Sequence, residues 1–110
     1  MQTVDKAYLD FERIFGAVQV NIYDHGHHAR TTGLVETRGD GFRTTLGGSG
    51  PDTESARADL IRTAKAALVV TVCSHGTDTD WTWDGACWVR LPGTDGWETA
   101  RRAALAVRRT

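Results

Sequence analysis

The chain has 110 residues, of which 40% are hydrophobic and 25% are charged, and its formal net charge at pH 7 is −1. This length and composition are typical of one globular domain and argue against a disordered chain. The charge disfavours a dedicated nucleic-acid binder, which usually carries a clear positive excess, although it leaves room for a local basic patch.

The cysteines, the N-terminal residues and the apolar runs predict the cellular location of the protein. Cys73 and Cys87 form no paired motif, as expected of reduced thiols in a cytoplasmic protein. Acidic residues in the N-terminal stretch MQTVDKAYLDFE argue against a signal peptide. The longest apolar run, AKAALVVTVC, is too short to cross a bilayer. Arginine far outnumbers lysine, which is typical of a bacterial or phage genome with high GC content.

In chain order, the first predicted elements are a helix over residues 3–15, a strand over 17–24 and a hairpin over 30–46. The helix has aromatic residues on one face, and the strand alternates apolar and polar side chains, as expected of a strand with one buried face. RGDG (38–41) supplies the tight turn of the hairpin. The histidine-rich sequence HGHHA is expected to be a loop between the strand and the hairpin.

The next predicted element is a helix over residues 52–66, which follows the glycine-rich stretch GGSG (47–50). We expect this stretch to be a connecting loop and the helix to begin at a cap supplied by Asp52 or Ser49. Its apolar positions recur at helical spacing and predict the buried stripe Ala56, Leu60, Ala64 and Ala67 or Leu68.

Three elements complete the chain. LVVTVCSHG (68–76) lacks polar alternation and predicts a central strand that is buried on both faces. DWTWDGACWVRL (80–91) predicts a hairpin with a two-residue turn at Asp84-Gly85, which would place Trp81 opposite Trp88. A final helix over 96–108 buries the stripe Trp97, Ala100 and Ala104, and Arg108 and Arg109 complement its dipole.

Short sequence matches relate the two halves of the chain. His25-Gly26 and His75-Gly76 both follow a strand, and similar Glu-Ser/Thr-Ala-Arg sequences open both later helices. A pseudo-repeat of residues 17–68 and 69–108 would place its two first strands side by side in one sheet. We therefore predict a single α+β domain over residues 1–110. An N-terminal helix precedes two βββα-like halves, which form a mostly antiparallel sheet of five or six strands with the helices packed on one face.

The histidines are candidate ligands for a metal ion. Zinc binds nitrogen and sulfur donors, so a strand edge that gathers histidines is a candidate site. The candidate ligands are His25, His27, His28 and His75. Their spacing matches no known structural zinc motif, and the alternative is a solvated turn whose histidines cap strand ends.

The order of the first strand, the hairpin and the ARADL helix resembles the start of the ribonuclease H fold. The resemblance implies a metal-dependent hydrolase or nuclease, in which a strand aspartate and a helix acid hold divalent metals. Asp24 and Asp59 match those two positions. Where a third acid should follow the next strand, the chain reads Cys-Ser-His, so His75 takes that place.

Residues 3–68 also resemble the double-stranded-RNA-binding domain in their α-β-β-β-α order. The resemblance implies RNA binding through cations at the start of the last helix, where this chain has Asp52 and Glu54 instead. Nucleic acid is therefore not the partner that we expect.

Three tryptophans of the predicted hairpin share one face, namely Trp81, Trp83 and Trp88, whereas Cys87, Val89 and Leu91 share the other. A hairpin that is apolar on both faces needs cover, from the core on one side and from a partner on the other. We therefore expect a small cytoplasmic, non-enzymatic binding or assembly module without a cofactor. The tryptophans would bind a protein partner or a second copy in a homodimer. A metal-dependent enzyme using zinc or another divalent metal is the alternative.

Overall fold

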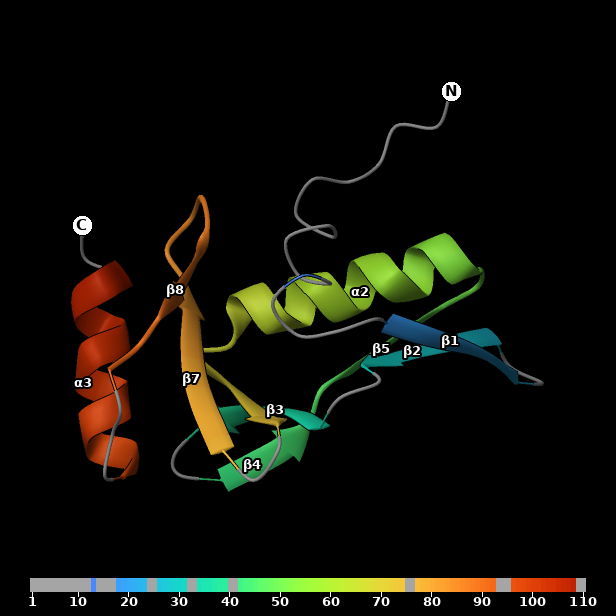
Figure 1. Cartoon of the computed structure of the whole chain (residues 1–110). Coiled ribbons are helices and arrows are strands. Elements are labelled where there is room, and N and C mark those ends of the chain that lie inside the picture. The colour runs from blue at the N-terminus through green and yellow to red at the C-terminus, as the bar shows by residue number, and fades with distance from the viewer. Residues whose placement is uncertain are drawn as a thin grey trace.

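The computed structural model describes residues 13, 18–23, 26–31, 34–39, 42–74, 77–92 and 96–108. The described residues form an α+β fold, as predicted, with two long helices, α2 (Thr53–Ala66) and α3 (Trp97–Arg108). Its strands are β1 (Val18–Tyr23), β2 (Gly26–Thr31), β3 (Leu34–Gly39), β4 (Phe42–Thr45), β5 (Gly47–Gly50), β6 (Val69–Ser74), β7 (Thr77–Trp83) and β8 (Trp88–Arg90) (Figure 1). The helix predicted over residues 3–15 lies outside the described residues, except for Arg13, which is helical.

The strands are divided between two antiparallel sheets, one with the order β1-β2-β5 and the other with the order β4-β3-β6-β7-β8. The prediction of a single sheet of five or six strands was wrong. The chain changes sheets three times, between β2 and β3, at Leu46 between β4 and β5, and through α2 between β5 and β6. Alternation along a strand does not mark such a change, because each short strand keeps its own period of two.

Strand register explains why the sheets separate at Leu46. Arg30 is opposite Gly47 in the first sheet, and Glu36 is opposite Thr45 in the second. Five sequence positions separate Arg30 from Glu36, whereas Leu46 alone separates Thr45 from Gly47, and such unequal lengths bend a strand pair. Leu46 is only 1% exposed, so the bend is anchored in the core.

The stretch predicted as a glycine-rich loop is the edge strand β5, which lies directly against α2 (Figure 1). A Cβ atom at Gly48 would lie 2.6 Å from Leu60 Cα and 2.7 Å from the Ala56 carbonyl oxygen. A Cβ atom at Gly50 would lie 2.6 Å from Ser55 Cβ. Glycine is required here because the strand and helix backbones touch.

Helix α2 begins at the predicted cap and buries most of the predicted stripe, but Ala67 and Leu68 lie beyond its end and are half-buried. The Asp52 carboxylate caps the helix by accepting a hydrogen bond of 2.7 Å from the Ser55 amide. The buried positions are Ala56, Leu60, Ile61 and Ala64. Among the described residues, no helix is long and apolar enough to span a bilayer.

The two helices cover opposite faces of the five-stranded sheet. Val70 and Val72 of the central strand β6 pack with the buried residues of α2, whereas Val69 packs with Ala100 and Ala104 of α3. Figure 1 shows α2 and α3 on either side of the β7–β8 hairpin. The prediction that β6 is buried on both faces is confirmed, whereas the prediction that the helices pack on one face was wrong. A strand with two apolar faces requires cover on both sides.

The first strands of the two halves do not lie side by side. β1 belongs to the three-stranded sheet, and β6 lies between β3 and β7 in the other. That consequence of the pseudo-repeat was wrong, although the duplication itself stays a prediction. The α-β-β-β-α order expected of residues 3–68 is also not matched, since five strands precede α2 among the described residues.

Candidate functional site

The histidine-rich segment predicted as a loop is largely strand β2. His27 is opposite Gly50, and His28 is opposite Ser49. The Nδ1 atom of His27 lies 3.1 Å from the Pro51 carbonyl oxygen, to which it donates a hydrogen bond when protonated. Because neighbouring residues of a strand point to opposite faces, His27 and His28 do not converge on one ligand.

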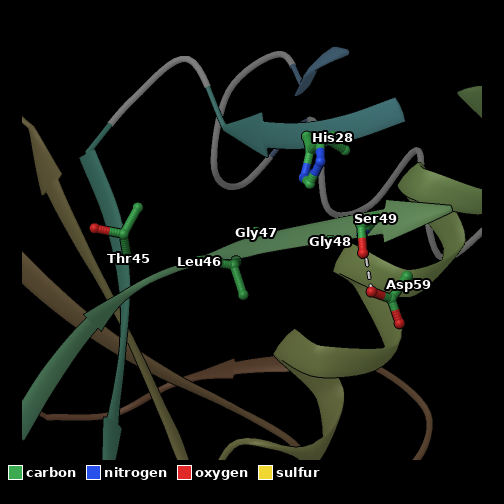
Figure 2. A pocket seen from close by; sticks show the side chains of 8 residues that line it. His28, Thr45, Leu46, Gly47, Gly48, Ser49 and Asp59 are labelled. Carbon is green, nitrogen blue, oxygen red and sulfur yellow. Dashed lines mark hydrogen bonds between the residues drawn. The ribbon is translucent and has the colours of Figure 1, made fainter. Parts of the chain in front are cut away.

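His28 lines a pocket of about 390 Å³ on the three-stranded sheet. Figure 2 shows His28 and Ser49 on neighbouring strands and Asp59 on the adjacent helix. Ala29, Thr45, Leu46, Gly47 and Gly48 complete the lining. The pocket gathers an imidazole, two hydroxyl groups and a carboxylate, which are polar groups that bind small polar molecules.

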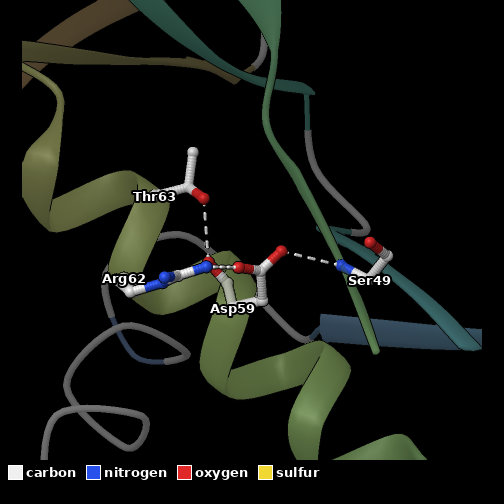
Figure 3. A network of polar contacts seen from close by, with 4 residues as sticks. All are labelled: Ser49, Asp59, Arg62 and Thr63. Atoms are coloured by element: carbon white, nitrogen blue, oxygen red, sulfur yellow. Dashed lines mark hydrogen bonds and ion pairs between the residues drawn. The ribbon is translucent and has the colours of Figure 1, made fainter. Parts of the chain in front are cut away.

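The Asp59 carboxylate holds β5 to α2 (Figure 3). The Ser49 amide donates a 3.0 Å hydrogen bond to Oδ2, and the Arg62 guanidinium pairs with Oδ1. The Ser49 amide, and after it Arg62, holds the pKa of Asp59 below its usual value. Both carboxylate oxygens are thus engaged inside the chain, so a metal at Asp59 would have to compete with these bonds.

The predicted metal and catalytic residues are only partly placed. Asp24, His25 and His75 lie outside the described residues, so their meeting with Asp59 stays a prediction. Among the described residues, no group of three or more histidine, cysteine, aspartate or glutamate side chains could hold a metal ion. His27 and His28 are in β2, at opposite faces of the strand.

The β7–β8 hairpin turns through four residues rather than two. The Asp84 carboxylate accepts hydrogen bonds from the amides of Ala86 and Cys87, and Gly85 has a φ of 106°. Trp83 is consequently opposite Trp88, which corrects the predicted pairing of Trp81 with Trp88. An aspartate that accepts bonds from the turn backbone favours this wider turn.

The change of register leaves the three tryptophans on one face, because it shifts the pairing by two residues. The rings of Trp83 and Trp88 meet edge to face, with their centroids 5.4 Å apart. Trp88 is 7% exposed within the core under α2, whereas Trp81 and Trp83 are half-buried at its margin. The tryptophan face therefore fills the core at Trp88 and is partly exposed at Trp81 and Trp83.

Two cations border the half-buried tryptophans. The Lys65 ammonium of α2 lies 4.3 Å from the centroid of the Trp83 ring, a cation–π contact. Arg90 is exposed and lies opposite Trp81, so their side chains share a face. We call this set the hairpin surface: Lys65, Trp81, Trp83 and Arg90. The sequence indicated the tryptophans but not the cations, since only strand pairing and helix packing bring them together.

The other face of the hairpin is covered by α3. Leu91 is 4% exposed in the cluster with Ala100 and Ala104, as expected of an apolar face that needs cover. Cys87 does not share this cover, because it is exposed in the turn with its thiol 3.4 Å from Asp84 Oδ2. Among the described residues, α2 and α3 therefore cover the two faces of the hairpin, and Trp81 and Trp83 are half-buried at the margin of this cover.

Comparison with known proteins finds no family model, curated protein or solved structure that matches the chain.

Proposed function

We propose that this chain is a small, non-enzymatic binding or assembly module that holds a protein partner against its hairpin surface. The observation that carries the proposal is the partial exposure of Trp81 and Trp83 beside Lys65 and Arg90. Tryptophan and arginine are the residues most enriched among those that dominate binding energy at protein interfaces.

The hairpin surface has a rigid base, which supports its use in binding. The Trp81 indole N–H donates a 3.1 Å hydrogen bond to the Thr79 hydroxyl, and Trp83 packs on buried Trp88. Side chains held in place before binding lose little conformational entropy when a partner arrives. Two held indole rings are therefore suited to act as binding anchors.

Site-specific photo-crosslinking in cells of the native host tests this function. With benzoylphenylalanine in place of Trp81, which keeps an aromatic ring there, we expect a discrete protein adduct after irradiation. The matched control carries the same group in place of Arg102, which is exposed on α3. An adduct of twice the chain mass identifies a second copy, and any other mass identifies a different protein. Equal labelling from both positions, or none from either, would contradict the proposed function.

A further inference from the structure

We infer that the hairpin surface binds an acidic segment of a different protein rather than a second copy of this chain, an inference that rests on the proposed function. The surface combines aromatic rings with positive charge. Lys65 lies over Trp83 on one side, and Arg90 lies beside Trp81 on the other. A carboxylate-bearing segment laid across the two rings would meet a cation at each end.

Two carboxylates, one on α2 and one in the β7–β8 turn, are held by groups other than Lys65 and Arg90. Asp59 is bonded to Ser49 and Arg62, and Asp84 is bonded to the backbone of its own turn. Among the described residues, no carboxylate forms an ion pair with Lys65 or Arg90. Within the described ranges these two charges are not compensated by a direct ion pair, and an anionic group is attracted to them most strongly where water is partly excluded.

A hollow next to the surface adds an apolar element to the recognition. A pocket of about 520 Å³ lies along α2, and its lining residues are Ala58, Ile61, Arg62, Lys65 and Ala66. Lys65 belongs to both the pocket and the hairpin surface. The pocket and the hairpin surface therefore meet at Lys65, and an acidic segment that also carries an apolar side chain would have partners in both.

Symmetry disfavours a second copy as the occupant. In a twofold dimer the same patch faces itself, so Lys65 and Arg90 would approach the same cations of the other subunit. Like charges brought together at an interface oppose association, whereas opposite charges favour it. The charge of the surface therefore selects a different, acidic partner.

Titration of the purified full-length chain with defined probes tests this inference, with tryptophan fluorescence and calorimetry as readouts. The probe is a synthetic peptide of aspartate and glutamate around two central leucines. Its control replaces each acid with the corresponding amide. We expect the acidic peptide to bind at least about tenfold more tightly than its amide control, and to lose affinity as ionic strength rises.

Charge-removing variants assign the binding to the surface. We expect the double variant Lys65→Gln with Arg90→Gln to lose about tenfold or more in affinity for the acidic peptide. The matched variant Arg102→Gln, which removes an exposed cation from α3, should bind as the unchanged chain does. Circular dichroism confirms that each variant remains folded before it is titrated.

Three outcomes would overturn the inference. The first is equal binding of the acidic and amide peptides, or no binding of either. The second is tighter binding of an oligothymidylate than of the acidic peptide, which would make single-stranded nucleic acid the occupant. The third is a dimer in sedimentation experiments that dissociates on substitution of Trp81. If the peptides fail while the crosslink from position 81 persists, the inference is wrong and the proposed function stands. If the crosslink from position 81 is also absent, both the inference and the proposed function are wrong.

Discussion

Gly48 occupies a point where a strand and a helix touch through their backbones. Its missing side chain leaves room for the Leu60 Cα and the Ala56 carbonyl oxygen, both within 2.7 Å of where a Cβ would be. Real Cβ atoms do not approach backbone atoms so closely, so any side chain here would push α2 away from β5. The contact between α2 and β5 accordingly depends on the absence of a side chain at Gly48.

We predict that Gly48→Ala lowers the free energy of unfolding by about 3 kcal/mol, because overpacking displaces the helix. The measurement is chemical denaturation followed by circular dichroism. Gly47→Ala is the matched control, since a Cβ there would lie 3.4 Å from the Ala29 carbonyl oxygen. We expect this control to change stability by no more than about 1 kcal/mol. Similar losses in both variants would contradict the close contact at Gly48.

Asp59 links stability to pH through the same junction. Its pKa in the folded chain is held down first by the Ser49 amide and then by Arg62. A lowered folded-state pKa gives stability that is present above the unfolded value of about 3.9 and is lost as pH falls through the folded value. We therefore predict that Asp59→Asn makes stability less dependent on pH below about pH 4.

Arg62→Gln is the control for the Asp59→Asn variant. It removes the second cause of the low pKa and keeps the first, the Ser49 hydrogen bond. Urea denaturation at several acidic pH values should show that this variant retains most of the pH dependence. Loss of the dependence in Arg62→Gln but not in Asp59→Asn would show that the carboxylate is not the titrating group.

At the scale of elements, Arg108 joins two helices and a strand. Its guanidinium donates hydrogen bonds to the Thr82 hydroxyl at 2.9 Å and to the Lys65 carbonyl at 3.1 Å, and it also bonds the Ala67 carbonyl. These carbonyls lie at the end of α2, where backbone acceptors lack helical partners. Burial lowers the pKa of Arg108, but an arginine remains charged at neutral pH. The sequence predicted only that Arg108 complements the dipole of its own helix.

We predict that Arg108→Ala lowers the free energy of unfolding by about 2–3 kcal/mol, since it leaves Thr82 and the end of α2 without their charged donor. Thr82 is fully buried, so water cannot readily replace the lost bond. Arg102→Ala on the exposed side of α3 is the control, with an expected change within about 0.5 kcal/mol. Urea denaturation measures both, and equal effects would rule out this linking role for Arg108.

At the scale of the whole molecule, α2 is shared by both sheets. It lies against β5 in the three-stranded sheet, and its buried residues pack with Val70 and Val72 in the five-stranded sheet (Figure 1). Leu46, where the chain passes between the sheets, belongs to the same core cluster. One helix and one buried crossing residue therefore join two sheets that have no strand in common. This arrangement also brings the end of α2 to the tryptophan hairpin, which places Lys65 over Trp83.

Features that depend on neighbouring residues could be predicted before the fold was known. These are the cap at Asp52, the buried stripe of α2, the two-sided burial of β6 and the tryptophans on one face. Helical and strand periods are encoded within each segment, so they could be predicted without knowledge of the fold. Three features emerged from long-range packing: the division into two sheets, the placement of the helices on opposite faces, and the meeting of Lys65 and Arg90 with the tryptophans. Those features depend on which distant strands pair and where a strand pair bends, and no local pattern of side chains specifies either.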